Sequence, residues 1–237
     1  MQPVLPQIQP RNTMPNPVTS FTPQRFAPLV MPGAAIHPQA SVIGNTVVSS
    51  GVNVAPFASI RGDEGTPIFI GQNSNVQDGV IIHGLKDGRV DHNGAQYSVY
   101  IGENTSLAHQ TQIHGPAKVG NNAFIGMQAF VFKAEIGDNV VIEPAAKVIG
   151  VKIAPNKYVP AGETIKTQEQ ADKLPDITED YANKHLNHEV VEVNKELAAS
   201  YPLNYYLPQI QPQCYAVYRL ENILCAPVGA PYGSPIM

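Results

Sequence analysis

The hydrophobic positions of this chain repeat every six residues. Aliphatic side chains recur at this interval over Ile36–Ile60, Ile70–Ile82 and Ile101–Val131, and the series continues from Ile136 to Val148. A small or β-branched residue stands two places before the next aliphatic position. A period of two would indicate half-buried strands and a period of 3.6 a helix, whereas a period of six is typical of hexapeptide β-helices.

The repeat therefore predicts an all-β domain, a left-handed parallel β-helix. Three short strands would form one triangular coil of about 18 residues, with the aliphatic side chains stacked inside. The chain has 22 Pro and 19 Gly among 237 residues, which agrees with short strands joined by many turns.

The repeat is interrupted twice before position 131. Ten residues separate Ile60 from Ile70, and nineteen separate Ile82 from Ile101. The longer interruption contains the segment GLKDGRVDHNGAQ, which is rich in Gly, Asp and Asn and predicts an extruded loop, roughly Leu85 to Tyr97. Loops on a rigid scaffold often carry function.

After about residue 166 the chain becomes charged and rich in helix formers. Four aliphatic residues follow the spacing of an amphipathic helix: Leu186, Val190, Val193 and Leu197. Thr178 is the expected N-cap. We expect a C-terminal α-helix that packs back along the β-helix.

These patterns predict four segments. They are an N-terminal Pro-rich extension (1–33), the β-helix catalytic domain (34–166), a C-terminal helical segment (167–201) and a Pro-rich tail (202–237). The sequence LPQIQP occurs in both end segments, at 5–10 and at 207–212. We interpret both as flexible or extended chain, with a docking motif as the alternative.

The charge and the termini limit the partners. The net charge is −4 and no basic run occurs, so we expect no nucleic acid partner. No stretch reaches the roughly 18 apolar residues of a membrane helix, and the N-terminus lacks the pattern of a signal peptide. We therefore expect no membrane and a cytoplasmic location, where Cys214 and Cys225 would be reduced.

Three histidines are candidate metal ligands. Three protein ligands plus a water molecule form the usual catalytic zinc arrangement. His83 and His114 each follow an inward aliphatic residue and so occupy equivalent outward positions. They lie 31 residues apart, about 13 more than one coil, and the extruded loop accounts for the excess. We expect the two to stack on adjacent coils. A single histidine on a strand is more often structural, so the spacing carries this prediction.

His109 does not fit the same position. It comes two residues after Leu107 and five before His114, which places it near a corner, on the preceding face. One protomer is therefore not expected to bring all three histidines together, whereas a neighbour packed around a threefold axis can supply the third. The spacing predicts a metal site shared across a subunit interface.

Three segments carry a resemblance to a known family. They are SIRGDEGTPIFIG (59–71), NSNVQDGVIIHGL (73–85) and SLAHQTQIHGPAKVGNNAFIGMQAFVF (106–132). They closely resemble γ-class carbonic anhydrases, including the archaeal type, and the similarity runs from about Ile36 to Tyr201. The chain also resembles the anhydrase-like domain of cyanobacterial carboxysome scaffolds, which adds carboxysome association as an alternative location. The resemblance implies a homotrimer that hydrates carbon dioxide reversibly to bicarbonate.

The resemblance also implies roles for individual residues. His83 and His114 would bind zinc, or iron or cobalt, from one subunit, and His109 from the next. Zinc lowers the pKa of its water to about 7 and so gives hydroxide at neutral pH. Gln77 would hydrogen-bond and orient that hydroxide, and Glu64 would move protons.

Five further residues complete the implied site. Asn75 would support it, and Asn194 on the C-terminal helix would help to position carbon dioxide. Arg61 would form ion pairs with Asp63 and Asp78 that hold the trimer interface.

The sequence departs from the family pattern in three places, one of which is Glu192, where the archaeal enzyme has a tyrosine. The archaeal enzyme has a longer, acid-rich loop with a proton-carrying glutamate, whereas the loop here contains no Glu. Asp87, Asp91 and His92 are the candidates to replace it, and His92 has the most suitable ordinary pKa. Cys214 and Cys225 are similar to a cysteine pair of the carboxysomal domains, but their spacing differs.

Two other functions remain open at this point. One is a non-catalytic or redox-regulated trimeric scaffold module with the same fold. The other is a hexapeptide acyltransferase, which uses one histidine as a general base. The three histidines, together with Arg61, Asp63, Glu64 and Gln77, argue against the acyltransferase.

Overall fold

The structure is a computed structural model that describes residues 12–206, 215–219 and 222–226. Both copies of LPQIQP, together with Cys214, lie outside the described residues. The chain divides into two compact units, Met1–Tyr201 and Pro202–Met237.

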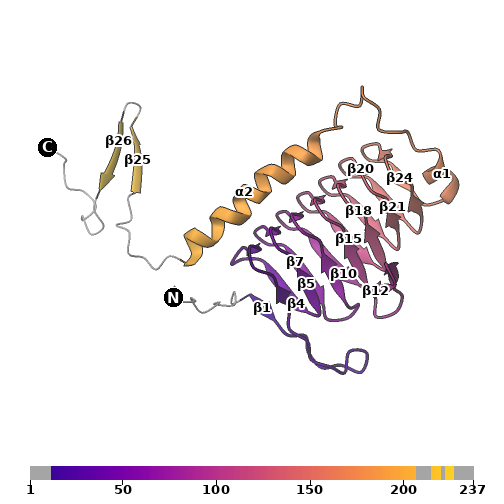
Figure 1. The fold of residues 1–237 in the computed structure, drawn as a ribbon, viewed down its shortest axis with the longest axis horizontal. Helices are drawn as coiled ribbons and strands as arrows, with labels where there is room; N and C mark the ends of the chain where they lie inside the picture. The colour runs from indigo at the N-terminus through magenta and orange to yellow at the C-terminus, as the bar shows by residue number, and fades with distance from the viewer. Residues whose placement is uncertain (1–11, 207–214, 220–221, 227–237) are drawn as a thin grey trace. The chain divides into compact units, whose positions relative to one another are not determined.

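The first unit is a left-handed parallel β-helix of about 8 turns (Figure 1). Three parallel sheets form its faces, and the coils contribute strands to each in turn. Sheet A contains β1 (Thr13–Met14), β4 (Ser41–Gly44), β7 (Ser59–Gly62), β10 (Ile81–Gly84), β15 (Gln112–Gly115), β18 (Phe130–Phe132), β21 (Lys147–Ile149) and β24 (Thr164–Ile165). Sheet B contains β2 (Leu29–Val30), β5 (Thr46–Val48), β8 (Ile68–Ile70), β13 (Val99–Ile101), β16 (Ala117–Val119), β19 (Glu135–Ile136) and β22 (Lys152–Ile153). Sheet C contains β3 (Ala35–Ile36), β6 (Asn53–Val54), β9 (Asn75–Val76), β14 (Ser106–Leu107), β17 (Phe124–Ile125), β20 (Val141–Ile142) and β23 (Tyr158–Val159).

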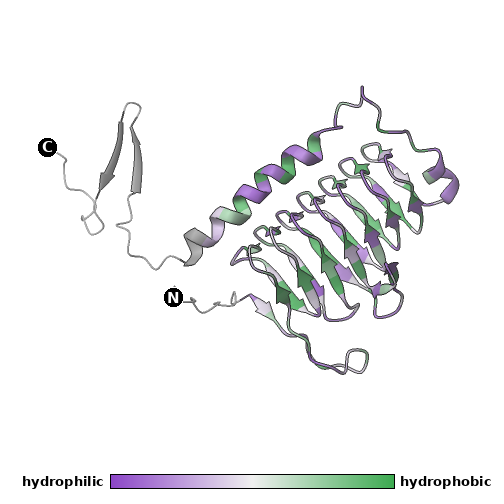
Figure 2. Ribbon diagram, in the orientation of Figure 1, coloured by the Kyte–Doolittle hydropathy of each residue, from purple (hydrophilic) through white to green (hydrophobic). Residues whose placement is uncertain are grey.

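The core is the column of aliphatic residues that the six-residue repeat predicted. In sheet C, Val76, Leu107 and Ile125 are in register on successive coils, and all three are fully buried. The small positions of the repeat, such as Ala58 and Ala123, are buried as well. Figure 2 shows the hydrophobic residues concentrated in these strands. The predicted fold class is confirmed.

The N-terminal residues contribute strands to the β-helix. β1 pairs with β4 and β2 pairs with β5, both in parallel. These strands lie within residues 1–33, so part of the expected extension continues the β-helix sheets.

The longer interruption of the repeat forms a hairpin beside the coils. Its strands β11 (Val90–His92) and β12 (Ala95–Tyr97) pair antiparallel. With this segment extruded, β10 and β15 are neighbours in sheet A, and His83 is in register with His114. The predicted stacking of these two histidines is confirmed.

Two helices follow the last coil, α1 (Gln168–Asp172) and α2 (Leu186–Tyr206). The expectation that the long helix begins after Thr178 is wrong, because residues 179–180 and 182–185 form turns and α2 begins at Leu186. Tyr181 stacks on Tyr158 and its hydroxyl donates to Glu143 Oε1 at 2.7 Å. These contacts hold the turns against the β-helix before the helix can start.

The part of α2 within the first unit packs along the β-helix as predicted (Figure 1), and two residues of the predicted stripe, Leu186 and Val190, pack against its apolar residues. The residues that it buries are Asn187, Val191, Asn194 and Ala198. These most deeply buried positions each lie one residue beyond the predicted stripe, whose Val193 is 59% exposed. Helical pattern alone missed these positions because two of the four residues are asparagines that bond to the β-helix.

The second unit contains one described hairpin, in which β25 (Tyr215–Arg219) and β26 (Asn222–Ala226) pair antiparallel. Among the described residues, no helix combines the length and the apolar character needed to cross a bilayer.

Candidate metal centre

His83 and His114 form one half of the candidate centre on the outer face of sheet A. Each follows an inward isoleucine on its strand, and side chains alternate between the two faces of a strand. Their ring centroids lie 5.4 Å apart with an interplanar angle of 87°. Two imidazoles at this separation are close enough to approach a single ion together.

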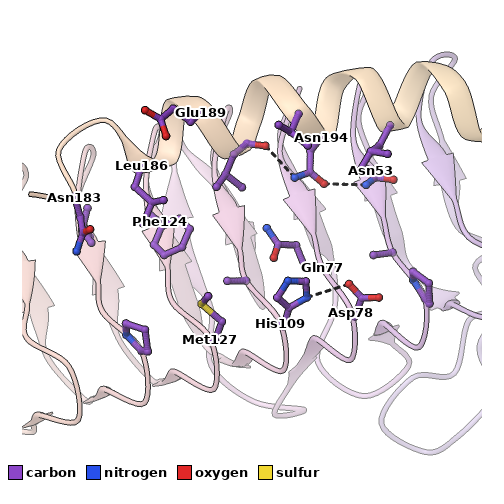
Figure 3. Close-up of a pocket in the computed structure, with 18 of the residues that line it drawn as sticks. Asn53, Gln77, Asp78, His109, Phe124, Met127, Asn183, Leu186, Glu189 and Asn194 are labelled. Atoms are coloured by element: carbon purple, nitrogen blue, oxygen red, sulfur yellow. Dashed lines mark hydrogen bonds and ion pairs between the residues drawn. The ribbon is translucent and has the colours of Figure 1, made fainter. Parts of the chain in front are cut away.

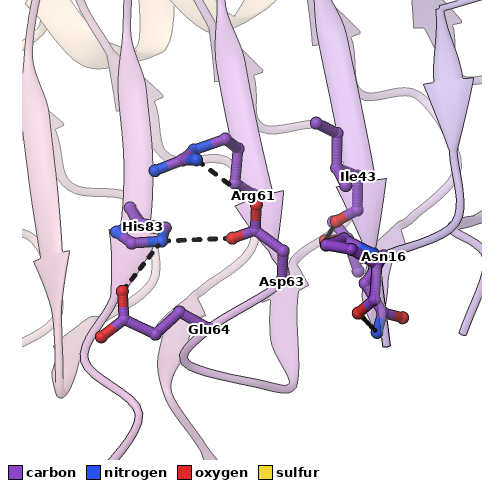
Figure 4. Close-up of polar contacts among 8 residues, drawn as sticks. Asn16, Ile43, Arg61, Asp63, Glu64 and His83 are labelled. Atoms are coloured by element: carbon purple, nitrogen blue, oxygen red, sulfur yellow. Dashed lines mark hydrogen bonds and ion pairs between the residues drawn. The ribbon is translucent and has the colours of Figure 1, made fainter. Parts of the chain in front are cut away.

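Carboxylates from the shorter interruption of the repeat surround His83 (Figure 4). His83 Nε2 lies 3.2 Å from Asp63 Oδ1 and 3.7 Å from Glu64 Oε2. Arg61 Nη1 donates to Asp63 Oδ2 at 3.3 Å within one protomer, and the role of this ion pair at a trimer interface stays a prediction. Asp63 therefore links the guanidinium to the imidazole.

The environment of His83 favours its neutral form. Burial lowers the pKa of the His83 imidazole below its ordinary value, and the nearby Arg61 guanidinium lowers it further. Together these effects outweigh the two carboxylates, which act in the opposite direction. A neutral imidazole is the form that binds a metal ion.

His109 lies away from this pair, two residues after the end of β14 in sheet C. Its Nδ1 lies 3.0 Å from Asp78 Oδ2, and both side chains are about half exposed. A carboxylate at one ring nitrogen fixes the tautomer and leaves the other nitrogen available as a metal ligand. Among the described residues Asp78 makes no contact with Arg61, and the pair expected across a trimer interface stays a prediction.

A groove of about 610 Å³ separates α2 from sheet C beside His109 (Figure 3). Gln77 and Asn194 line it together with His109. Gln77 Nε2 donates to Asn75 Oδ1 at 3.0 Å, and Asn75 Nδ2 donates to Ser106 Oγ at 2.8 Å. This buried chain of hydrogen bonds fixes the amide of Gln77 at the groove.

Two residues of this region were missed at the sequence level. Ser106 ends the hydrogen-bond chain from Gln77, and Asn53 Nδ2 donates to Asn194 Oδ1 at 2.9 Å. Both are in the register row of Asn75 in sheet C. A polar residue directly before the inward aliphatic position, repeated on three coils, is the signal that could have identified them.

The loop candidates for proton transfer are largely engaged in the hairpin. Asp91 accepts hydrogen bonds from Gly94 N–H and from the Gln96 amide. The ring of His92 stacks on Tyr100 of sheet B, with centroids 3.9 Å apart. Asp87 is mostly exposed. The role predicted for these residues stays a prediction.

The chain thus presents two separate groups of site residues. The sheet-A half-site comprises Arg61, Asp63, Glu64, His83 and His114. The groove half-site comprises Asn75, Gln77, Asp78, His109 and Asn194. Across the part of the chain that the structure describes, no three His, Cys, Asp or Glu side chains gather closely enough to hold a metal ion. Two imidazoles in register fit a histidine-ligated metal if a further ligand comes from another copy of the chain.

Comparison with known proteins identifies the family. Over 200 residues the chain is 52% identical to the carbonic anhydrase of Methanosarcina thermophila, and the match covers 80% of this chain and 81% of that one. The chain belongs to the γ-class carbonic anhydrases. No protein-family model matches it.

This γ-class carbonic anhydrase is also similar to part of a larger protein. It is 41% identical over 191 residues to the carboxysome assembly protein CcmM of Nostoc sp., a match that covers 80% of this chain and 33% of CcmM.

Solved structures share the fold at lower identity. A solved acetyltransferase structure from Bacillus cereus has a TM-score of 0.62 at 22% identity, and the match covers 81% of this chain and 99% of that one. A hexapeptide transferase from Anaplasma phagocytophilum has a TM-score of 0.58 at 20% identity, with coverage of 74% and 93%. These two likenesses concern the fold alone.

Proposed function

We propose that this chain hydrates carbon dioxide reversibly to bicarbonate at a metal centre between the subunits of a homotrimer. The observation that carries the proposal is the register of His83 with His114, beside Asp63 and Glu64. The identity of 52% with an archaeal carbonic anhydrase supports the same activity.

The metal would be held by His83 and His114 of one protomer and by His109 of the next. Zinc is the first candidate, with iron or cobalt as alternatives, because imidazole suits all three. A divalent ion bound there makes water acidic enough to supply a nucleophile at neutral pH. Asp78 would orient the His109 ring through its contact at Nδ1.

Gln77 and Glu64 would act around that nucleophile. Asn75 holds Gln77 Nε2, while Gln77 Oε1 makes no hydrogen bond among the described residues and can accept one from the nucleophile. Glu64 Oε1 accepts the Lys86 backbone N–H at 3.2 Å, and its side chain is partly exposed. A carboxylate held between a buried imidazole and solvent is suited to carry protons away from the centre.

The remaining residues would position the substrate and the subunits. Asn194 would contact carbon dioxide from the groove. Arg61 and Asp78 are both partly exposed, and an ion pair between them would join neighbouring protomers. Because such a pair is partly screened by water, its main effect would be on geometry.

A non-catalytic trimeric scaffold is the second candidate, and the similarity to carboxysome assembly proteins favours it. It would place the protein at a carboxysome, whereas the anhydrase is equally consistent with the general cytoplasm. Redox regulation through Cys214 and Cys225 stays a prediction, since neither side chain is described.

Stopped-flow hydration of carbon dioxide by metal-analysed protein, prepared without air, tests the proposal beside a His109→Ala variant. We expect activity in proportion to about one metal ion per protomer, and its loss in the variant. A fully metal-loaded protein without activity, under both reducing and oxidising conditions, would contradict the anhydrase and favour the scaffold.

A further inference from the structure

Asn53 forms a buried amide pair beneath α2 that the mechanism so far does not use. It is 2% exposed, and its Nδ2 donates to Asn194 Oδ1 across 141 positions of sequence. Asn53 Oδ1 is also buried and finds no hydrogen-bond partner among the described residues. A buried acceptor without a partner lowers stability, so packing alone does not explain an asparagine here.

The pair determines which polar group Asn194 has left. An asparagine amide has one oxygen and two N–H donors. Asn194 Oδ1 accepts from Asn53, and Asn194 Nδ2 donates to the Val190 carbonyl at 2.9 Å (Figure 3). With the oxygen and one N–H occupied, the amide cannot turn over, and a single N–H donor remains.

Asn194 lines the groove together with Gln77 and His109. Carbon dioxide and bicarbonate carry oxygen acceptors, so an N–H donor attracts these oxygens and a carbonyl oxygen would repel them. If Asn194 were free to rotate by half a turn, it would present its oxygen for part of the time. The orientation of this amide therefore matters to any substrate with exposed oxygens.

We propose that Asn53 is a positioning residue, which holds the Asn194 amide so that its N–H remains available to the oxygens of carbon dioxide or bicarbonate. This inference deepens the proposed function and rests on it. Asn53 also lines the groove, but its unpaired oxygen is buried, so the role proposed for it acts through Asn194.

The test combines stability with steady-state kinetics for Asn53→Leu, Asn194→Ala and the double variant. Leu removes the unpaired acceptor, so we expect a melting temperature equal to or above that of the wild type. We expect kcat/KM to fall about fivefold, as for the loss of one hydrogen bond. Asn194→Ala should cause a similar loss, and the double variant no further one, because the two residues act as a unit.

Thr22→Val is the matched control. Thr22 Oγ1 is likewise buried without a partner in the described residues, but it lies in the N-terminal segment and does not line the groove. The control should keep or gain stability at unchanged kcat/KM. A separate variant, Asn194→Asp, keeps an oxygen for Asn53 but loses the N–H, so its kcat/KM should also fall about fivefold.

Several outcomes would overturn the inference. One is a wild-type kcat/KM in Asn53→Leu, and another is a double variant whose kcat/KM falls by the product of the two single losses. A third is wild-type kcat/KM in Asn194→Asp, a result that overturns the inference even if Asn53→Leu does not fold. A metal-loaded wild type that does not hydrate carbon dioxide would overturn the proposed function and this inference with it.

Discussion

Two inactive variants should restore activity when they assemble together, provided that the metal centre is shared between protomers. His83→Ala damages only the sheet-A half-site, and His109→Ala damages only the groove half-site, because the two residues lie on different sheets. A trimer built from either variant alone contains no complete centre. A mixed trimer can combine an intact half-site from one protomer with an intact half-site from the other.

The arrangement sets the size of the effect. In a closed ring of three protomers, every interface joins the sheet-A half-site of one copy to the groove half-site of the next. A ring that contains both variants, in either two-to-one ratio, has one interface at which the intact sheet-A half-site of a His109→Ala protomer meets the intact groove half-site of a His83→Ala protomer. Mixed trimers should therefore have about one third of wild-type activity, with about one metal ion per trimer.

Co-expression with two different affinity tags, followed by tandem purification, isolates the mixed trimers for stopped-flow hydration and metal analysis. The matched control is the pair His83→Ala with His114→Ala, which damages the same half-site twice. That mixture has no complete centre and should stay inactive. Activity in the control, or inactive but correctly assembled His83→Ala/His109→Ala trimers, would refute the shared centre.

Three other predictions address the metal, its support and the core. Removal of the metal by a chelator should abolish activity but leave the far-ultraviolet circular dichroism spectrum unchanged, because the three histidines lie outside the aliphatic column; cooperative unfolding on chelation would contradict this. Asp78→Asn should weaken metal binding about tenfold in competition with a chromophoric chelator, since His109 loses the carboxylate at Nδ1, and unaltered affinity would argue against that role. Leu107→Ala should lower the free energy of unfolding by about 2–5 kcal/mol in denaturant titration, because Leu107 is fully buried between Val76 and Ile125; a loss below about 1 kcal/mol would show that the column relaxes around the cavity.

The sequence predicted the features that depend on the stacking of coils. An aliphatic residue every six positions locates the inward column, and the length of one coil locates His83 opposite His114 once the loop is removed. Both follow from local spacing. The same argument placed His109 on a different face, where the structure has it.

The features that the sequence did not predict depend on contacts between polar residues far apart in the chain. The most deeply buried position in the middle of α2 was missed because hydropathy favours Val193, whereas the structure buries Asn194 against Asn53. The late start of α2 likewise depends on the contact of Tyr181 with Glu143. The row that contains Asn53 has a signal in the sequence, but neither pairing does, because the partners lie 141 and 38 positions apart and are brought together only by the fold.

The features that the sequence did not predict involve outward side chains of the β-helix, and there is a physical reason for this. The aliphatic column can stabilise a β-helix whatever the outward side chains are, so the outward rows are free to differ between proteins with this fold. Here one outward row of sheet A reads Arg61, His83, His114 on successive coils, and one row of sheet C reads Asn53, Asn75, Ser106. An apolar row under α2 would have packed without an unpaired acceptor. Since polar groups were retained there at a cost in stability, and since they hold the amides of Gln77 and Asn194 beside His109, the second row belongs to the chemistry of the site as much as the first.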